Sequence, residues 1–293
     1  MSIIERALQK VQGQADGKSA PRHAGDPSAP VSVAPAANVS LHEPRRSIHF
    51  ERSRLFDRNA VVGVEEAWLT TEEFRRIKWP LLNAAFGRDG RTDPCGPLLM
   101  VTSAVPGEGK TFVAVNLALS VASDLEGSAL LVDGDLAKQH VSEMFGVANQ
   151  PGLTDVLMDP DLDLTDVILG TNVPGLRLLP AGRHNPNAPE LLASRRMSEV
   201  VEWLRTHYPQ SLVVFDSPPL LATNEAQVLS QHVGQVLLVV KANDTPQAIV
   251  QEAVTLVAPG KPVSAILNQT TRSRAGQYYG AYYGRKERHG AAT

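Results

Sequence analysis

The residues best suited to chemistry form one stretch, Ser103-Ala104-Val105-Pro106-Gly107-Glu108-Gly109-Lys110-Thr111. The apolar run at 98–101 before it predicts a buried strand, and the apolar spacing at 112–121 after it predicts a helix. Glycines let backbone N–H groups turn inward around a polyanion, and a helix N-terminus adds a positive dipole end. We therefore expect Lys110 to reach the outer phosphates of a nucleotide and the Thr111 hydroxyl to bind Mg²⁺.

One position departs from the common phosphate-loop pattern G-x-x-x-x-G-K-[ST], because Ala104 takes the place of the first glycine. A small residue there still permits a tight turn. The alternative is an ordinary strand-to-helix turn that contains two glycines and a lysine by chance. Acidic residues at the ends of two further predicted strands favour the phosphate loop.

Those acidic residues are Asp133, Asp135 and Asp216. Asp133 ends a buried run and Asp135 follows two residues later, so we expect both side chains to leave the strand on the same side. A carboxylate at the end of a buried run is costly unless a metal or a donor meets it. Mg²⁺ on nucleotide phosphates takes one or two carboxylates, often through water. The alternative for any one of them is a turn or helix cap; three beside one phosphate loop favour a metal site.

Strands and helices alternate from Leu98 onward. Continuous β-branched and leucine runs flanked by helices predict an α/β fold of the P-loop NTPase type, with a mostly parallel central sheet and helices on both faces. Ligands on such sheets bind at the carboxyl ends of the strands. The predicted strands are 98–103, 129–133, 176–179, 212–216, 236–241 and 263–268, and predicted helices include 198–204 and 247–257.

Composition narrows the class of protein. The chain has 293 residues, 43% hydrophobic and 20% charged, and its net charge of −3 argues against a nucleic-acid partner. Cys95 is the single cysteine, which excludes an internal disulfide and a cysteine-based metal cluster and favours a reducing compartment. We expect no secretory signal and no transmembrane segment, since no run of roughly 18 apolar residues is present.

Four regions are predicted. Residues 1–12 fit a short amphipathic helix, either a docking element or a frayed end, and 13–45 are rich in Pro, Ala, Ser and Gly, as is typical of a disordered linker. Residues 46–270 form the nucleotide-binding domain, which begins with an arm that packs back on it. Residues 271–293 form a flexible tail.

The tail holds four of the five tyrosines, Tyr278, Tyr279, Tyr282 and Tyr283, among glycines and basic residues. Such a composition cannot build a core, so the aromatic rings are expected to be accessible. One interpretation is an aromatic tail that binds a partner. The other is a set of modification sites.

Upstream of the phosphate loop, Thr70 and Glu73 have the spacing of a helix cap. Glu72, Arg75 and Lys78 then share one polar face of that helix. This face is either solvated or a contact between subunits.

Three motifs together, 106–111 (PGEGKT), 131–136 (LVDGDL) and 214–219 (VFDSPP), resemble the bacterial tyrosine kinases, P-loop enzymes of capsule and exopolysaccharide production. Residues 1–8 and the block 72–82 (EEFRRIKWPLL) resemble, more narrowly, the exosortase-associated exopolysaccharide tyrosine autokinases. The resemblance implies ATP and Mg²⁺ as cofactors.

The resemblance also implies roles for single residues. Lys110, Asp133 and Asp135 would be catalytic, with Asp133 accepting the tyrosine proton. The residues that would bind ATP are Gly107, Glu108, Gly109, Lys110, Thr111, Phe112 and, at the adenine, Asn268, although an ordinary turn asparagine is an alternative for the last. The residues that would hold Mg²⁺ are Thr111, Asp133, Asp135 and Asp216. The phosphoacceptors would be Tyr278, Tyr279, Tyr282 and Tyr283.

Two positions depart from the family. Ala137 stands where members usually carry an arginine, with Lys138 next to it. Glu72, Arg75 and Lys78 resemble the family's E-x-x-R-x-x-R oligomerisation helix with lysine at the last place, which keeps the charge but loses the two-pronged grip on a carboxylate.

The implied function is ATP-dependent protein-tyrosine autophosphorylation of the tail, in trans, within a ring-like homo-oligomer in exopolysaccharide biosynthesis. The implied partners are a polysaccharide chain-length (co-polymerase) membrane protein as activator and a tyrosine phosphatase. The implied location is the cytoplasm, at the inner face of the bacterial membrane. The alternative is a partitioning-type (ParA/MinD-like) ATPase switch, whose loop normally carries a lysine where this chain has Val105; a further alternative is a regulatory subunit without turnover.

Overall fold

The computed structural model describes residues 44–50, 68–87 and 96–270. The predicted N-terminal helix, most of the predicted linker and the tyrosine tail lie outside the described residues. Within the described ranges, no helix combines the length and the apolar character that crossing a bilayer requires.

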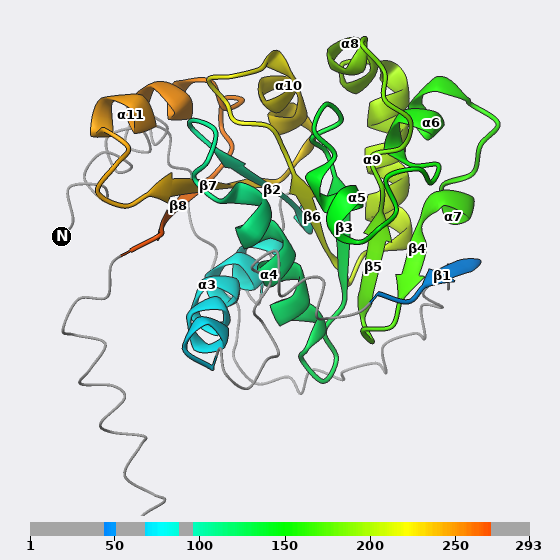
Figure 1. Ribbon diagram of the computed structural model, residues 1–293, viewed down its shortest axis with the longest axis horizontal. Helices are drawn as coiled ribbons and strands as arrows, with labels where there is room; N and C mark the ends of the chain where they lie inside the picture. The colour runs from blue at the N-terminus through cyan, green and yellow to red at the C-terminus, as the bar shows by residue number, and fades with distance from the viewer. Residues whose placement is uncertain (1–43, 51–67, 88–95, 271–293) are drawn as a thin grey trace, which may run out of the picture.

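The described domain is built on one eight-stranded sheet with the order β1-β4-β5-β3-β6-β2-β7-β8 (Figure 1). Every strand pair is parallel except β4–β5. The predicted mostly parallel sheet is therefore confirmed, with β7 starting one residue earlier than expected. Sequence patterns missed β1 and β4, which have three residues each and are too short to show a period. The strands are β1 (Arg46–Ile48), β2 (Leu98–Ser103), β3 (Ala129–Asp133), β4 (Leu169–Thr171), β5 (Leu176–Leu179), β6 (Leu212–Asp216), β7 (Gln235–Lys241) and β8 (Val263–Asn268).

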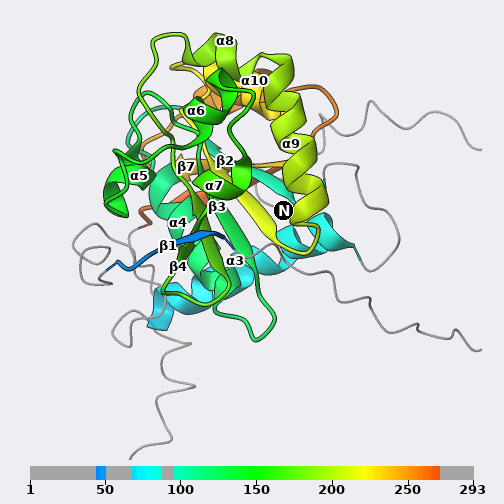
Figure 2. The same cartoon turned by 90° about the vertical axis from the view of Figure 1, so that its right-hand side faces the viewer.

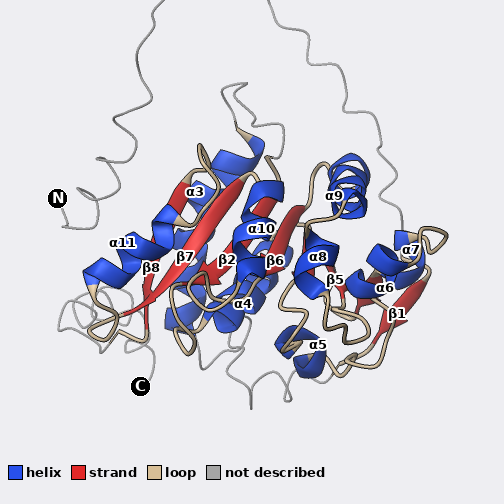
Figure 3. Cartoon of the chain, turned by 90° about the horizontal axis from the view of Figure 1, so that it is seen from above, coloured by secondary structure: helices blue, strands red, loops and turns tan. Residues whose placement is uncertain are grey.

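Helices cover both faces of the sheet, as Figures 2 and 3 show. Along β2, Leu98 and Met100 join the apolar cluster under α8, α9 and α10, whereas Leu99 and Val101 join the cluster under α3 and α4. This two-sided burial explains why the strands read as continuous apolar runs. The helices are α3 (Trp68–Phe86), α4 (Lys110–Ala122), α5 (His140–Met144), α6 (Leu153–Met158), α7 (Leu164–Val167), α8 (Ala188–Leu192), α9 (Arg195–His207), α10 (Asn224–His232) and α11 (Gln247–Thr255).

The expected N-terminal arm packs on the domain as far as it is described. β1 pairs with β4 at the sheet edge, and the buried ring of Phe50 meets Phe145 edge-on, with ring centroids 4.8 Å apart. The side chain of Asn172 bonds both backbone polar groups of Phe50. Apolar packing and backbone pairing together anchor the arm.

Two predictions about α3 are wrong. The helix already includes Trp68, so Thr70 lies inside its first turn and does not cap it; the ring of Phe74 on this helix packs against Phe112 of α4. Lys78 does not share a solvated face with the exposed Glu72–Arg75 ion pair. Its side chain is buried, and Nζ donates to Ser120 O at 2.8 Å and to Asp124 Oδ1 at 2.6 Å. The long lysine stem lets the charge cross from α3 to the C-terminal end of α4.

We predict that Lys78→Met destabilises the chain by about 1–3 kcal/mol, because the carbonyl of Ser120 loses its buried donor. Arg75→Ala, in the exposed pair on the same helix, should change the free energy of unfolding by less than about 1 kcal/mol. Urea unfolding of both variants measures the difference. Equal effects would contradict a structural role for Lys78.

Candidate active site

The phosphate loop lies where the alternation of strands predicts it, at the carboxyl end of β2 and the start of α4. Gly107 and Gly109 have φ values of +86° and +93°, which side chains other than glycine rarely adopt. Ala104 is fully buried and is not among the described residues with positive φ. Alanine is therefore tolerated at the place of the first glycine, because this backbone does not require glycine there.

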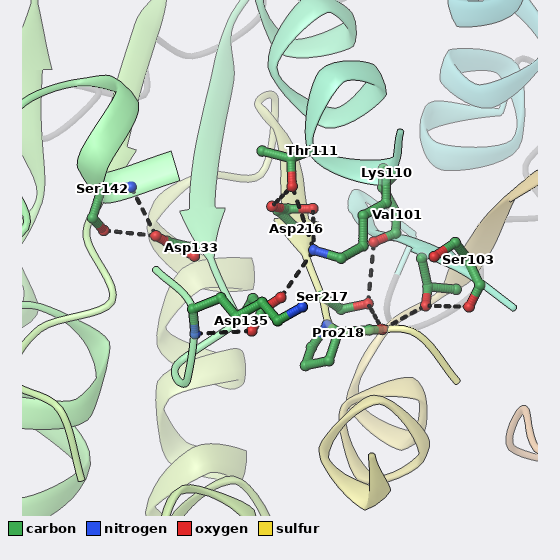
Figure 4. Close-up of polar contacts among 12 residues, drawn as sticks. Val101, Ser103, Lys110, Thr111, Asp133, Asp135, Ser142, Asp216, Ser217 and Pro218 are labelled. Atoms are coloured by element: carbon green, nitrogen blue, oxygen red, sulfur yellow. Dashed lines mark hydrogen bonds and ion pairs between the residues drawn. The ribbon is translucent and has the colours of Figure 1, made fainter. Parts of the chain in front are cut away.

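Lys110 is the centre of the site's polar contacts (Figure 4). Its Nζ donates to Asp135 Oδ2 at 2.9 Å and lies 3.7 Å from Asp216 Oδ1. Thr111 Oγ1 donates to Asp216 Oδ2 at 2.7 Å. Lys110 is only 8% exposed. The structure thus brings the loop lysine, the loop threonine and two of the predicted aspartates together.

Asp133 comes to the same place through the sheet. β3 and β6 are parallel neighbours, and their register places Asp133 opposite Asp216. Both carboxylates are fully buried. Asp133 and Asp135, however, have different contacts: Asp133 bonds Ser142, whereas Asp135 lies beyond the end of β3 and bonds Lys110.

The electrostatics of the site reflect an excess of buried negative charge. Burial, followed by the charge of Asp216, raises the pKa of Asp133 to about 7 despite the hydrogen bonds from Ser142. Burial also raises the pKa of Asp216, although Lys110 and Thr111 oppose the shift. Burial lowers the pKa of Lys110, but Asp216 and Asp135 outweigh it and the net pKa is raised. Lys110 therefore stays charged, while a proton or another cation is favoured at the aspartates.

The residues present fit a magnesium ion. Asp133 Oδ1 and Asp216 Oδ1 are buried and accept no hydrogen bond. Such oxygens are costly unless a cation or donor meets them. Within the described ranges, no three His, Cys, Asp or Glu side chains form a ready-made metal cage. Mg²⁺ usually combines one or two carboxylates with waters and nucleotide phosphates, so the two unpaired carboxylate oxygens are the observation that fits it. Thr111, Asp133 and Asp216 would hold the ion, while Asp135 bonds Lys110.

Ser142, at the start of α5, is a residue of the site that sequence patterns missed. Its backbone N–H and its hydroxyl both bond Asp133 Oδ2, at 2.8 and 2.7 Å. The hydroxyl in turn accepts from the N–H of Ala181, after β5. The contact depends on the path of the connection between β3 and α5, so no sequence signal pointed to it.

Three residues expected at the nucleotide have other contacts. The carboxylate of Glu108 bonds backbone and side-chain groups near the end of β7. The ring of Phe112 packs against Phe74 of α3, with centroids 5.9 Å apart. Asn268 Nδ2 donates to the carbonyl of Glu108 at 2.8 Å. Their roles toward the nucleotide stay predictions.

Of the remaining predicted residues, those that the structure describes make none of the side-chain contacts given above for Lys110, Thr111, Asp133 or Asp216. Ala137 and Lys138 are exposed, and the backbone N–H of Lys138 bonds Asp135 Oδ1 at 3.2 Å. Glu72, Arg75 and Lys78 lie on α3. The four tail tyrosines lie outside the described residues.

We predict that Asp133→Asn stabilises the metal-free chain more at pH 8 than at pH 5. The folded chain keeps the Asp133 proton up to about pH 7, whereas the unfolded chain loses it near pH 4, so the contribution of this group to the free energy of unfolding falls as pH rises between those values. The variant's advantage over the parent should grow by about 2–4 kcal/mol between the two pH values.

Chemical unfolding at both pH values, with and without Mg²⁺, checks this prediction. Mg²⁺ should reduce the difference at pH 8, because the ion compensates the carboxylate of the parent. A pH-independent difference would contradict the assignment of Asp133 as the group with the raised pKa.

Comparison with known proteins agrees with this geometry. No protein-family model matches the chain. The chain is 32% identical over 238 residues to the tyrosine-protein kinase YwqD of Bacillus subtilis, covering 80% of this chain and 95% of that protein. It is 35% identical over 188 residues to the tyrosine-protein kinase Wzc of Salmonella typhimurium, covering 63% of this chain but 26% of that protein.

Solved structures show the same fold. The chimerical protein CapA2B2 superposes with a TM-score of 0.64 at 27% identity, over 80% of this chain and 96% of that one. The kinase domain of the Escherichia coli tyrosine kinase Etk superposes with a TM-score of 0.57 at 29% identity, over 69% and 78%. The septum-site protein MinD of Pyrococcus horikoshii, solved with Mg-ADP, reaches 0.51 at 26% identity, over 60% and 71%. The extent and identity of the match to YwqD show that the chain belongs to the family of bacterial tyrosine-protein kinases.

Proposed function

We propose that this chain uses ATP and Mg²⁺ to phosphorylate tyrosines of its own C-terminal tail, mainly in trans. The observation that carries the proposal is the meeting of Lys110, Thr111, Asp216 and Asp135 at the phosphate loop, with Asp133 in register beside Asp216. Placement and charge stabilisation are what phosphoryl transfer requires of a protein.

The chain's own residues divide the work. Gly107 and Gly109 shape the loop around the phosphates, and Lys110 moves from Asp135 to the outer phosphates and offsets their charge. Thr111, Asp133 and Asp216 would hold Mg²⁺, which would supply positive charge to offset the charge that develops on the phosphates. Asp133, buried at the end of β3 beside Asp216, accepts the phenol proton. The phenol oxygen forms its bond to the γ-phosphorus as the bond to the β-phosphate oxygen breaks, which releases ADP.

The tail supplies acceptors of suitable chemistry. Tyr278, Tyr279, Tyr282 and Tyr283 lie among basic residues, and each phosphate adds about −1.5 to −2 charge at neutral pH. Several phosphates would reverse the charge of the tail. We propose that a ring-like homo-oligomer holds tails in neighbouring sites and loosens as this charge accumulates. A tyrosine phosphatase would reverse the change.

We further propose a role in exopolysaccharide or capsule biosynthesis, with activation by the cytosolic segment of a polysaccharide co-polymerase in the inner membrane. The kinship with Wzc, of which this chain corresponds to 26%, supports a partner of this kind. The MinD-like switch is the weaker proposal. Val105 is an apolar residue packed against the core, where that class needs a lysine to complete the partner's site.

We predict that the parent chain, incubated with ATP and Mg²⁺, becomes phosphorylated on the tail tyrosines and that Lys110→Met abolishes this label. The variant lacks the buried lysine of the phosphate loop, which offsets the charge of the phosphates. Mass spectrometry of the tail measures both. Lys261→Met, a matched change just before β8, should label like the parent. Equal labelling of the Lys110 variant would reject the kinase assignment.

Transfer between chains has its own test. A Lys110→Met chain with an intact tail is mixed with a parent chain truncated after residue 270. The tail of the inactive chain should become labelled. If the inactive chain stays unlabelled in this mixture while the intact parent, incubated by itself, becomes labelled, transfer occurs within one chain.

A further inference from the structure

The phosphate loop is held from outside through its carbonyl groups. Carbonyls that turned into the loop would repel phosphates, whereas N–H groups that turn inward bind them. Hydrogen bonds from other groups of the protein occupy the carbonyls of Ser103, Ala104, Val105, Gly107, Glu108 and Gly109. The donors to the carbonyls of Gly107 and Glu108 are side chains that lie about 160 residues later in the chain.

Those partners stand at the carboxyl end of β8. Asn268 Nδ2 donates to Glu108 O at 2.8 Å, and Gln269 Nε2 donates to Gly107 O at 2.9 Å. A Cβ atom on Gly109 would lie 2.1 Å from Asn268 Nδ2. Glycine is therefore needed at 109 for two reasons, its positive φ and the close approach of this amide.

Glu108 makes the second attachment. Its carboxylate is 1% exposed and reaches out of the loop to the turn after β7. Oε2 accepts from the N–H of Val105 at 2.8 Å, and Oε1 accepts from the N–H of Lys241 at 3.1 Å and from the hydroxyl of Thr245. Within the described ranges no ion pair neutralises this carboxylate, so N–H and O–H donors stabilise it.

The residues that bond the loop from β7 and from β8 are held at neighbouring strand ends. β7 and β8 are parallel neighbours, with Lys241 paired to Asn268. The N–H of Ala242 donates to Asn268 O at 2.9 Å, and the N–H of Thr245 donates to Lys241 O at 3.2 Å, which closes the turn. A rigid pair of strand ends thus holds one side of the loop.

We propose that Glu108, Thr245, Asn268 and Gln269 form a loop clamp, a set of positioning residues that fixes the phosphate loop in its anion-binding shape before nucleotide arrives. The inference rests on the proposed function only in taking ATP as the nucleotide. The family resemblance implies that Glu108 and Asn268 bind ATP. The proposal gives both residues a different role, which is to hold the phosphate loop in position. A preset loop lowers the ordering cost of binding.

The test measures binding of ADP with Mg²⁺ by titration calorimetry on the full chain, together with KM and kcat for ATP. Thr245→Val removes one hydroxyl and should weaken ADP binding about threefold to tenfold, the usual net worth of one hydrogen bond. Because ground and transition states both use the loop, KM should rise by the same factor while kcat changes little. The double change Asn268→Ala with Gln269→Ala should weaken binding further.

Two matched variants separate positioning from folding. Thr245→Ser keeps the hydroxyl and should restore the parent's affinity. Thr255→Val, at an exposed threonine of α11 whose hydroxyl bonds only Glu252 O among the described contacts, should leave affinity unchanged. Thermal unfolding without nucleotide should show each single variant still folded at the temperature of the titration, with Thr245→Val the least stable because the buried Glu108 carboxylate loses a donor.

Parent-like ADP affinity in Thr245→Val and in the double variant would overturn the clamp, and so would failure of Thr245→Ser to restore it. A parent chain that binds ADP but leaves its tail unlabelled would reject the kinase proposal and leave the clamp standing. A parent chain that binds no ADP would reject both.

Discussion

The burial of carboxylates around one ammonium group is the constraint on which the site depends. Asp133, Asp135 and Asp216 are all buried near Lys110, and two of their oxygens accept no hydrogen bond. Without a further cation this arrangement is costly, as the raised pKa values of Asp133 and Asp216 express. A magnesium nucleotide, as proposed, would supply the missing positive charge to the aspartates and an anionic partner to Lys110.

The fold keeps this unfavourable arrangement in place. Parallel register between β3 and β6 sets Asp133 beside Asp216, and the loop after β2 sets Lys110 between Asp216 and Asp135. Ser142 fixes the orientation of Asp133 from α5. The apolar layers on both faces of the sheet provide the stability that holds these charges together. Ala104 is not among the described residues with positive φ, whereas Gly107 and Gly109 are, so the loop backbone requires glycine at the latter two positions.

The sequence predicted those parts of the site that local chemistry determines. The phosphate loop, the six longer strands and the aspartates that end two of them follow from apolar runs, glycines and charge. The residues whose roles were mispredicted or missed make contacts with residues on other elements of the fold. Lys78 was expected on a face that is either solvated or in contact with another subunit, because helical spacing says nothing of a neighbouring helix that offers an acceptor. Ser142 and the clamp partners of Glu108 were missed because loop paths bring them together.

The most direct test of this account is the position of the metal. A crystal structure of the full chain with ADP and Mn²⁺ in place of Mg²⁺ locates the ion by its anomalous scattering. The account predicts a peak beside the hydroxyl of Thr111, bound directly or through one water to Asp133 and Asp216, with Lys110 moved from Asp135 to the phosphates. A peak away from these aspartates, or a nucleotide bound with Lys110 still on Asp135, would contradict it.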